Sequence, residues 1–385
     1  MIKLNTAVNY SSKRASTSVV NLDNYISIDN ILQNKAGISS AVKLPPSNND
    51  MGAYDPGHIL VGNIRPYLKK IWFSDRSGGC SADVLNFEVN KGFDPKFVYY
   101  AMLRDDFFIH MMKGSKGSKM PRGDKNQILD FIIPDFDLPK QHKIASVLSV
   151  LDSKIDLNNK INTELEAMAK LIYDYWFVQF DFPDQNGKPY KSSGGKMVWS
   201  EELKREIPKG WEVRKIENLA TIQRGNLITE ETANTSGDIK VVAAGINYSY
   251  KHDESNFAEN TITVSSSGAN AGYINLWREP IYASDCIVLR GINDTMTFYI
   301  WGYLNLVKGH VLNQAHGSAQ PHVYPSDLEN LFWVEPSKNT LNQFSNIIIP
   351  LNKKNGVKLR ENQKLVELRD WLLPMLMNGQ VKLKP

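Results

Sequence analysis

The segment that decides the fold begins at Pro139 and reads PKQHKIASVLSVLDSKIDLNNKINTELEAMAKLIYDYW (residues 139–176). Apolar residues recur in it with a seven-residue period, and Lys154 and Asn158 interrupt the middle. A seam kept over this length is typical of helices that pack on each other rather than on a globule. The period therefore predicts one long helix, with seam residues Ile144, Leu151, Ile161, Leu165, Met168 and Ile172.

A second segment, about 200 residues further on, has the same pattern. Polar residues again interrupt its middle, and buried polar residues in such a seam would fix the register of two paired helices. Pro350 and Gly356 predict a kink or a late beginning of this helix. Its predicted seam residues are Phe344, Leu351, Leu365, Leu368 and Leu372.

The sequence upstream of each helix is also repeated at nearly the same offset. Three features recur in the same order: 79–85 with 282–288, 113–121 with 314–321, and 128–134 with 328–336. Three matches in order indicate an internal repeat.

The repeat predicts an organisation of globule, helix, linker, globule, helix. Both globules read as mixed α/β (α+β), with strand-like runs and with buried helices at 97–103 and 298–304. The linker is polar and rich in glycine and serine. The predicted boundaries are 1–138 and 208–338 for the globules, 139–180 and 339–385 for the helices, and 181–207 for the linker.

Composition excludes several classes of protein. The chain has 385 residues, 42% hydrophobic and 22% charged, which is ordinary for globular domains. The formal net charge of +4 permits an acidic polymer as partner but does not demand one. Two cysteines without CxxC spacing fit a reducing cytoplasm, and they argue against a disulfide scaffold or a cysteine-built zinc site. No stretch approaches the roughly 18 apolar residues of a membrane span.

Two similar globules on paired helices suggest a use for this geometry. If the helices pair antiparallel, a pseudo-two-fold axis relates the repeats. A helix of about 35–40 residues spans roughly 50–60 Å. Duplex DNA has local two-fold axes, and symmetric readers meet half-sites about one helical turn apart. Two non-identical readers on a rigid spacer would therefore suit a split, asymmetric DNA target.

Charge patterning indicates which loops would touch DNA. The first globule has a Gly/Ser-rich basic loop with Lys116, Lys119, Arg122 and Lys125, which suits phosphates and guanine edges. A further basic-aromatic group contains Arg65, Tyr67, Lys69 and Lys70. The corresponding candidates of the second globule are Ser267, Asn270, Tyr273, His316, Gln320 and His322.

These residues also have simpler explanations. The basic loop could be an ordinary solvated surface, and the histidine spacing matches no helical metal site, so no metal is predicted. The Ser/Gly run lacks the ending of a P-loop. Asp83 and Asp285 recur in both copies, but no acid, base or histidine recurs beside them. They are expected to hold turns, and no catalytic residues are predicted.

Several blocks of this sequence resemble the specificity subunits of type I restriction–modification systems. The block 138–155 is similar to the start of the central conserved region of that family, and 176–183 with 207–211 to its end. Blocks 62–70, 119–125 and 317–325 are similar to segments of the recognition domains, and 372–379 to the distal conserved helix. The N-terminus has no counterpart of 207–211, so the first recognition domain is expected to be entered differently or to be slightly shortened at its edge strand.

The resemblance implies two target recognition domains joined by an antiparallel coiled coil, each reading half of a bipartite DNA sequence. The subunit itself would perform no chemistry. Two methyltransferase subunits would dock along the helices, and restriction/translocase subunits would complete the nuclease. S-adenosylmethionine, ATP and magnesium would belong to those partners.

Two other functions stay open at this point. A two-domain α/β enzyme would need a site between its domains, and the absence of a repeated acid/base set counts against it. A protein-only coiled-coil adaptor would have no DNA affinity, and the basic loop counts against it.

Overall fold

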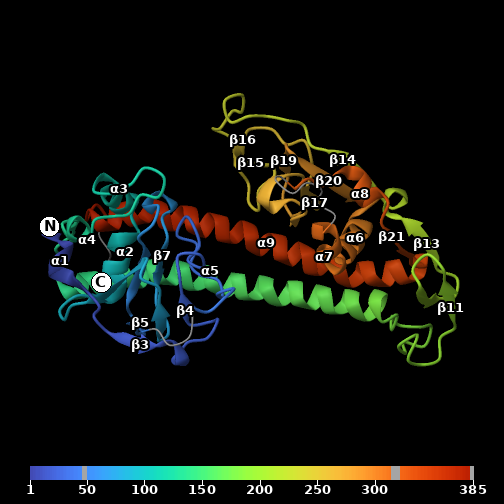
Figure 1. Ribbon diagram of the computed structural model, residues 1–385, viewed down its shortest axis with the longest axis horizontal. Helices are drawn as coiled ribbons and strands as arrows, with labels where there is room; N and C mark the ends of the chain where they lie inside the picture. The colour runs from blue at the N-terminus through green and yellow to red at the C-terminus, as the bar shows by residue number, and fades with distance from the viewer. Residues whose placement is uncertain (46–49, 314–320, 382–385) are drawn as a thin grey trace. The chain divides into compact units, whose positions relative to one another are not determined.

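The computed structural model describes residues 1–45, 50–313 and 321–381. The chain divides into two compact units (Figure 1). The first unit comprises Met1–Leu157 and Asn362–Pro385, and the second comprises Asn158–Glu361. Each unit therefore contains one α/β domain together with a part of each of the two long helices.

The first unit is built on two four-stranded sheets. One has the order β2-β9-β6-β7 and is fully antiparallel, and the other has the order β3-β5-β8-β4 with a parallel β4–β8 pair. Helix α2 packs the buried side chains of Phe97 and Tyr100 into the core beneath the first sheet. The strands are β1 (Ile2–Lys3), β2 (Val8–Tyr10), β3 (Arg14–Ser16), β4 (Tyr25–Ile26), β5 (Asp50–Tyr54), β6 (Ile59–Gly62), β7 (Ile71–Phe73), β8 (Gly78–Cys80), β9 (Val84–Val89) and β10 (Ile132–Ile133). The helices are α1 (Leu4–Ala7), α2 (Pro95–Leu103), α3 (Asp105–Lys113) and α4 (Lys125–Leu129).

The second unit repeats this plan. Its four-stranded antiparallel sheet has the order β14-β20-β17-β18, and its three-stranded sheet β16-β15-β19 contains a parallel β15–β19 pair. The strands are β11 (Met197–Ser200), β12 (Arg205–Pro208), β13 (Glu212–Lys215), β14 (Ala220–Arg224), β15 (Ile239–Val242), β16 (Tyr250–His252), β17 (Thr261–Ser265), β18 (Ile274–Trp277), β19 (Ile281–Ala283), β20 (Cys286–Gly291) and β21 (Phe332–Glu335). The helices are α6 (Asp294–Leu306), α7 (Lys308–Asn313) and α8 (Pro325–Glu329).

The internal repeat predicted from the sequence is confirmed by this topology. In both units a central strand (β9 or β20) leads to a buried helix (α2 or α6) whose first turn is capped by a side chain, Asp94 or Asn293. A short helix (α4 or α8), an edge strand (β10 or β21) and a long helix follow in both. The first strands of the two domains differ in length: β1 pairs two residues with β10, whereas β13 pairs four residues with β21.

The segment before β13 folds onto the second unit. It contains the β11–β12 hairpin. In this segment the ring of Phe182 stacks on the rings of Tyr190 and Trp211, with centroid distances of 4.7 Å and 4.8 Å. These aromatic contacts join the large core of the second unit, where Phe177 and Phe344 also meet at 5.0 Å.

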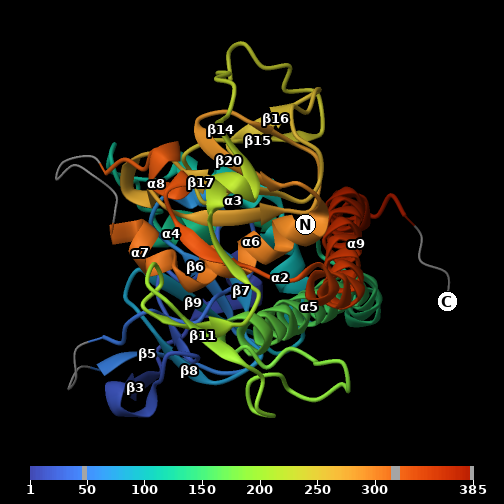
Figure 2. The same ribbon diagram turned by 90° about the vertical axis from the view of Figure 1, so that its right-hand side faces the viewer.

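The two long helices are α5 (Leu138–Tyr173), continued by a π-helical turn over Asp174–Val178, and α9 (Lys338–Met377). Within each unit they lie side by side (Figure 2) and run antiparallel (Figure 1). In the first unit Arg369 bonds Asp152, and in the second unit Asn355 bonds the backbone carbonyl of Asn162. The helix α9 begins at Lys338 and continues through Pro350, so the predicted late beginning is wrong.

The seam between the helices is more polar than predicted. Ile144, Leu165 and Phe344 are buried in it, and Leu151, Ile161, Ile172, Leu351, Leu365 and Leu372 are partly buried. Met168 and Leu368 are 50% and 42% exposed, so their assignment to the seam is wrong. An α-helix turns every 3.6 residues, so a strict seven-residue period drifts off the buried face. Polar residues take the inward positions instead: Asn158, Asn162, Asn352, Asn355, Asn362 and Arg369.

Candidate nucleic-acid interface

The two basic groups predicted in the first globule lie next to each other in the first unit. The segment after β6 and the loop before α4 form an antiparallel bridge between Ile64 and Arg122. The amide of Arg65 donates to the carbonyl of Pro121 at 2.8 Å, and the amide of Gly123 donates to the carbonyl of Asn63 at 3.3 Å. Arg65 has a φ of 52°, a left-handed conformation that turns the chain here. Two segments about 55 residues apart in sequence thus form one surface.

Most of the basic side chains on this surface are accessible. The side chains of Lys116 and Arg122 are 86% and 59% exposed, and Lys119 is exposed as well. The amides and carbonyls of Lys116 and Arg122 bond each other reciprocally at 3.0 Å, which holds the loop as a narrow hairpin. Lys125 extends over the ring of Tyr10, with its Nζ 5.6 Å from the ring centroid.

The basic-aromatic group of Arg65, Tyr67, Lys69 and Lys70 contains both accessible side chains and side chains that bond other parts of the protein. Tyr67 is 50% exposed, and the Nζ of Lys69 lies 2.9 Å from a carboxylate oxygen of Asp105. Lys70 is only 9% exposed and its ammonium bonds the carbonyl of Ile28, so its prediction as a DNA contact is wrong. Burial lowers the pKa of Lys70 below its usual value. Its sequence neighbours gave no sign of this, because strand β7 begins at the next residue and turns Lys70 inward.

The second unit forms the same pattern of backbone hydrogen bonds between two segments from other residues. We call this pattern the loop frame. The amide of Gly268 donates to the carbonyl of Pro321 at 3.1 Å, and the amide of Val323 donates to the carbonyl of Ser266 at 3.0 Å. Ser267 and His322 form the bridge that corresponds to Ile64 and Arg122. Asn270 and Tyr273 belong to the turn that follows, where the amide of Tyr273 donates to the carbonyl of Asn270 at 2.9 Å. His316 and Gln320 lie outside the described residues.

Three residues of the second surface were not predicted from the sequence as contacts: Tyr324, Arg224 and Lys308. The ring of His322 stacks on Tyr324, with centroids 6.3 Å apart and an interplanar angle of 23°. The guanidinium of Arg224 lies 5.9 Å from the centroid of the same Tyr324 ring, and the Nζ of Lys308 lies 5.1 Å from that of Tyr273. Arg224 ends β14 and Lys308 begins α7, so only the fold brings these cations to the aromatic residues of the loops.

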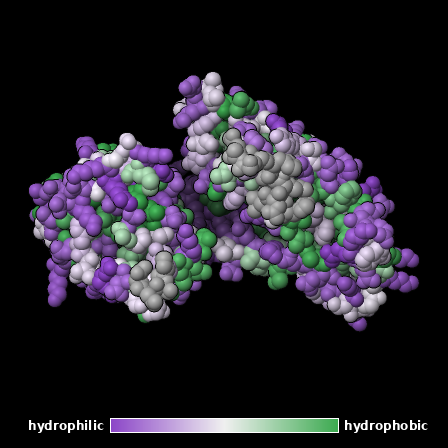
Figure 3. All heavy atoms as spheres, viewed as in Figure 1, coloured by the Kyte–Doolittle hydropathy of each residue, from purple (hydrophilic) through white to green (hydrophobic). Residues whose placement is uncertain are grey.

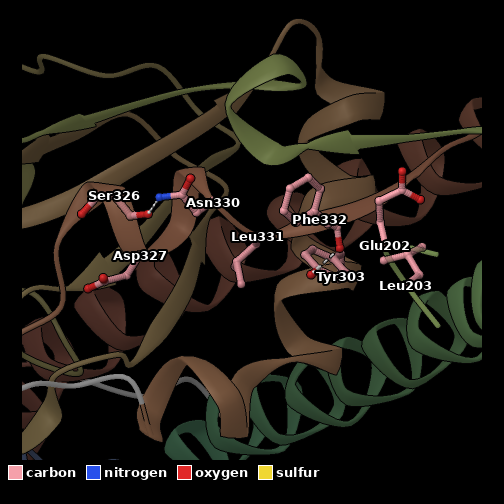
Figure 4. Close-up of a pocket in the computed structure, with 8 residues that line it drawn as sticks. All are labelled: Glu202, Leu203, Tyr303, Ser326, Asp327, Asn330, Leu331 and Phe332. Atoms are coloured by element: carbon pink, nitrogen blue, oxygen red, sulfur yellow. Dashed lines mark hydrogen bonds between the residues drawn. The ribbon is translucent and has the colours of Figure 1, made fainter. Parts of the chain in front are cut away.

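A cavity in the second unit lacks the features of an active site. Its volume is about 530 Å³. Figure 4 shows its lining residues: Glu202, Leu203, Tyr303, Ser326, Asp327, Asn330, Leu331 and Phe332. The carboxylate of Asp327 accepts from the amide of Tyr324 at 2.8 Å and caps α8. Glu202 accepts from the hydroxyl of Ser200 at 2.9 Å, and the hydrogen bonds it accepts lower its pKa. Asp327 therefore serves as a helix cap, and Glu202 is engaged in local hydrogen bonds.

The described parts of the chain contain neither a cluster of metal ligands nor a helix that could span a membrane. In residues 1–45, 50–313 and 321–381 no three His, Cys, Asp or Glu side chains gather as metal ligands would. No helix among these residues combines the length and the apolar character that crossing a bilayer requires. The exposed surface shown in Figure 3 is mainly hydrophilic in both units, with scattered hydrophobic residues.

The fold and the two loop surfaces define a tandem-repeat protein, with two α/β domains on an antiparallel helix pair and different polar side chains on the same loop frame. The family described as "type I restriction modification DNA specificity domain" matches residues 13–167 and 208–351. The chain belongs to this family.

Relatives and a solved structure agree with this assignment. The MjaIX specificity subunit of Methanocaldococcus jannaschii is 24% identical over 75% of this chain and 69% of its own length. The HindI specificity subunit of Haemophilus influenzae is 22% identical over 93% of this chain and 94% of its own length. The crystal structure of a type I restriction–modification S subunit from M. genitalium is 16% identical, with a TM-score of 0.57 over 100% of this chain and 96% of that one. This last likeness concerns the fold alone.

Proposed function

We propose that this chain is the specificity subunit of a type I restriction–modification system and reads a bipartite, asymmetric DNA sequence. The observation that carries the proposal is the repeated loop frame with different side chains, Arg122 in the first unit and His322 in the second. A repeated frame conserves the way a domain approaches the duplex, whereas base contacts set the sequence that is read. The chain supplies recognition, and its partners supply the chemistry.

The proposed partners are double-stranded DNA, two methyltransferase subunits and the restriction/translocase subunits. S-adenosylmethionine, ATP and magnesium would be bound by these partner subunits. We place the assembly in the cytoplasm. Both cysteines, Cys80 and Cys286, are buried free thiols, as expected of a chain that folds under reducing conditions.

The long helices offer a surface for the methyltransferase subunits. Apolar side chains point outward from both helices: Val150 is 68% exposed, Leu171 69% and Trp371 58%. We propose that these residues belong to the surfaces that the methyltransferase subunits cover. Replacing Leu171 and Trp371 with glutamate should weaken assembly with the methyltransferase subunits while leaving the thermal midpoint of the isolated chain nearly unchanged.

Footprinting tests the proposed function directly. The chain, assembled with its methyltransferase subunits, should protect two short patches on one duplex with unprotected base pairs between them. Uniform protection of unrelated duplexes would contradict the proposal. Turnover by the chain alone would favour the enzyme, and no duplex affinity in any assembly would favour the protein-only adaptor.

A further inference from the structure

The two loop frames match residue by residue in their backbone hydrogen bonds. In each unit the residue with a positive φ, Arg65 or Gly268, donates its amide to the carbonyl of a proline, Pro121 or Pro321. The residue that follows each proline forms the bridge to the opposite segment. Arg122 and His322 therefore occupy the same position in the two domains.

An aspartate also occupies the same position beside both frames. Asp83 immediately precedes β9, and Asp285 immediately precedes the corresponding strand β20. In the first unit the carboxylate of Asp83 accepts from an Nη of Arg122 at 3.0 Å. In the second unit the carboxylate of Asp285 accepts from the hydroxyl of Ser266 at 3.1 Å. The acid is retained and the residue that it holds has changed.

We propose that Asp83 and Arg122 form a base-reading pair, in which Asp83 positions the guanidinium to recognise a guanine in the first half-site, and that His322 sets a different base preference at the equivalent position of the second. This inference rests on the proposed function. It names Asp83 as a positioning residue and assigns one base contact to each domain.

The geometry at Arg122 favours a base edge over a phosphate. A guanidinium has five N–H donors. Asp83 takes one of them, and no other side-chain acceptor bonds Arg122 within the described ranges. The remaining donors can form the bidentate bond to O6 and N7 of guanine. A carboxylate 3.0 Å away repels a phosphate but tolerates a neutral base.

The pair is also held before DNA arrives. Reciprocal backbone bonds to Lys116 and the bridge to Ile64 fix the backbone of Arg122 on both sides. Asp83 is fixed as well, because its carbonyl accepts from the amide of Asn63 at 2.9 Å. Fixing a long side chain in advance reduces the entropy lost on binding. Lys119, in contrast, is exposed in the same loop and is suited to a phosphate.

Selection from a library of duplexes with a randomised 40-base-pair insert tests the proposal. The probe is the full chain assembled with its methyltransferase subunits, in wild-type form and with Arg122→Lys, Asp83→Asn, His322→Ala or Lys119→Ala. The wild type should enrich an interrupted motif with a guanine in its first part. Arg122→Lys should reduce the preference for this guanine by roughly 10–100-fold. Asp83→Asn should reduce it by a smaller factor, and both should leave the second part unchanged.

The other variants make the result specific. His322→Ala should change only the second part, and Lys119→Ala should weaken binding to all sequences without changing the motif. An unchanged first part with both Arg122→Lys and Asp83→Asn would overturn the inference, and so would equal loss of both parts in a folded protein. If the wild type enriches no interrupted motif, the proposed function fails. If it does so and only the Arg122 and Asp83 results disagree, the inference alone fails.

Discussion

Replacing Asn162 with leucine should stabilise the second unit, because its amide is buried in the helix seam without satisfying its hydrogen bonds. Asn162 is 7% exposed, and neither its Oδ1 nor its Nδ2 has a hydrogen-bond partner within the described residues. Each unsatisfied buried polar group costs about 1–3 kcal/mol. Some of the gain from removing the amide is lost if leucine strains the seam. We expect a net gain of about 1–3 kcal/mol in the free energy of unfolding.

The assay is thermal and urea unfolding of Asn162→Leu beside Asn159→Leu. Asn159 is exposed on the same helix, so this control gains the same helix propensity without changing the seam. At roughly 2–4 °C per kcal/mol for a unit of this size, the thermal midpoint should rise by about 2–12 °C over the control. A midpoint at or below that of Asn159→Leu would refute the reasoning, because the amide would then be contributing to stability.

Three further predictions follow from burial and charge. Leu165→Glu should lower the free energy of unfolding in urea by about 3 kcal/mol or more, because Leu165 is only 8% exposed. Met168→Glu should change this free energy by less than about 0.5 kcal/mol. Equal effects would contradict the seam described above. Lys119→Ala should reduce the slope of log DNA affinity against log salt concentration by about 1, whereas Lys70→Met should leave this slope unchanged. A reduced slope for Lys70→Met would mean that the Lys70 ammonium reaches DNA. Burial raises the pKa of Cys80 to about 11, so its thiol stays protonated at pH 8. It should therefore react with iodoacetamide only as fast as the protein unfolds. Rapid alkylation of the native protein would show that Cys80 is accessible.

The fold could largely be predicted from the sequence because its information is local and repeated. The blocks 128–134 and 328–336 each contain an edge strand, and a long helix begins shortly after each block. The seam was harder to predict. Leu368 matches the seven-residue period but points outward, and the neighbouring Arg369 turns inward to bond Asp152. A pattern of apolar residues cannot reveal a seam that is built from charged and amide side chains.

The candidate site could be predicted only in part. The loop with Lys116 and Arg122 was recognisable from its local charge. It faces the segment after β6 because of backbone bonds between segments that are distant in sequence. Lys70 looked equivalent to Lys69 in sequence, yet only Lys70 is buried. Arg224 could not be assigned, because it meets Tyr324 through the packing of α8 beside β14 rather than through sequence proximity.

The measurement that tests the central claim most directly is sequencing of methylated adenines in the host genome, with the gene for this chain intact and deleted. The account predicts one methylated motif made of two different specified parts with unspecified bases between them, and its disappearance on deletion. A motif that survives deletion, or one that is continuous or read identically by both domains, would contradict the claim that two dissimilar domains read an interrupted sequence.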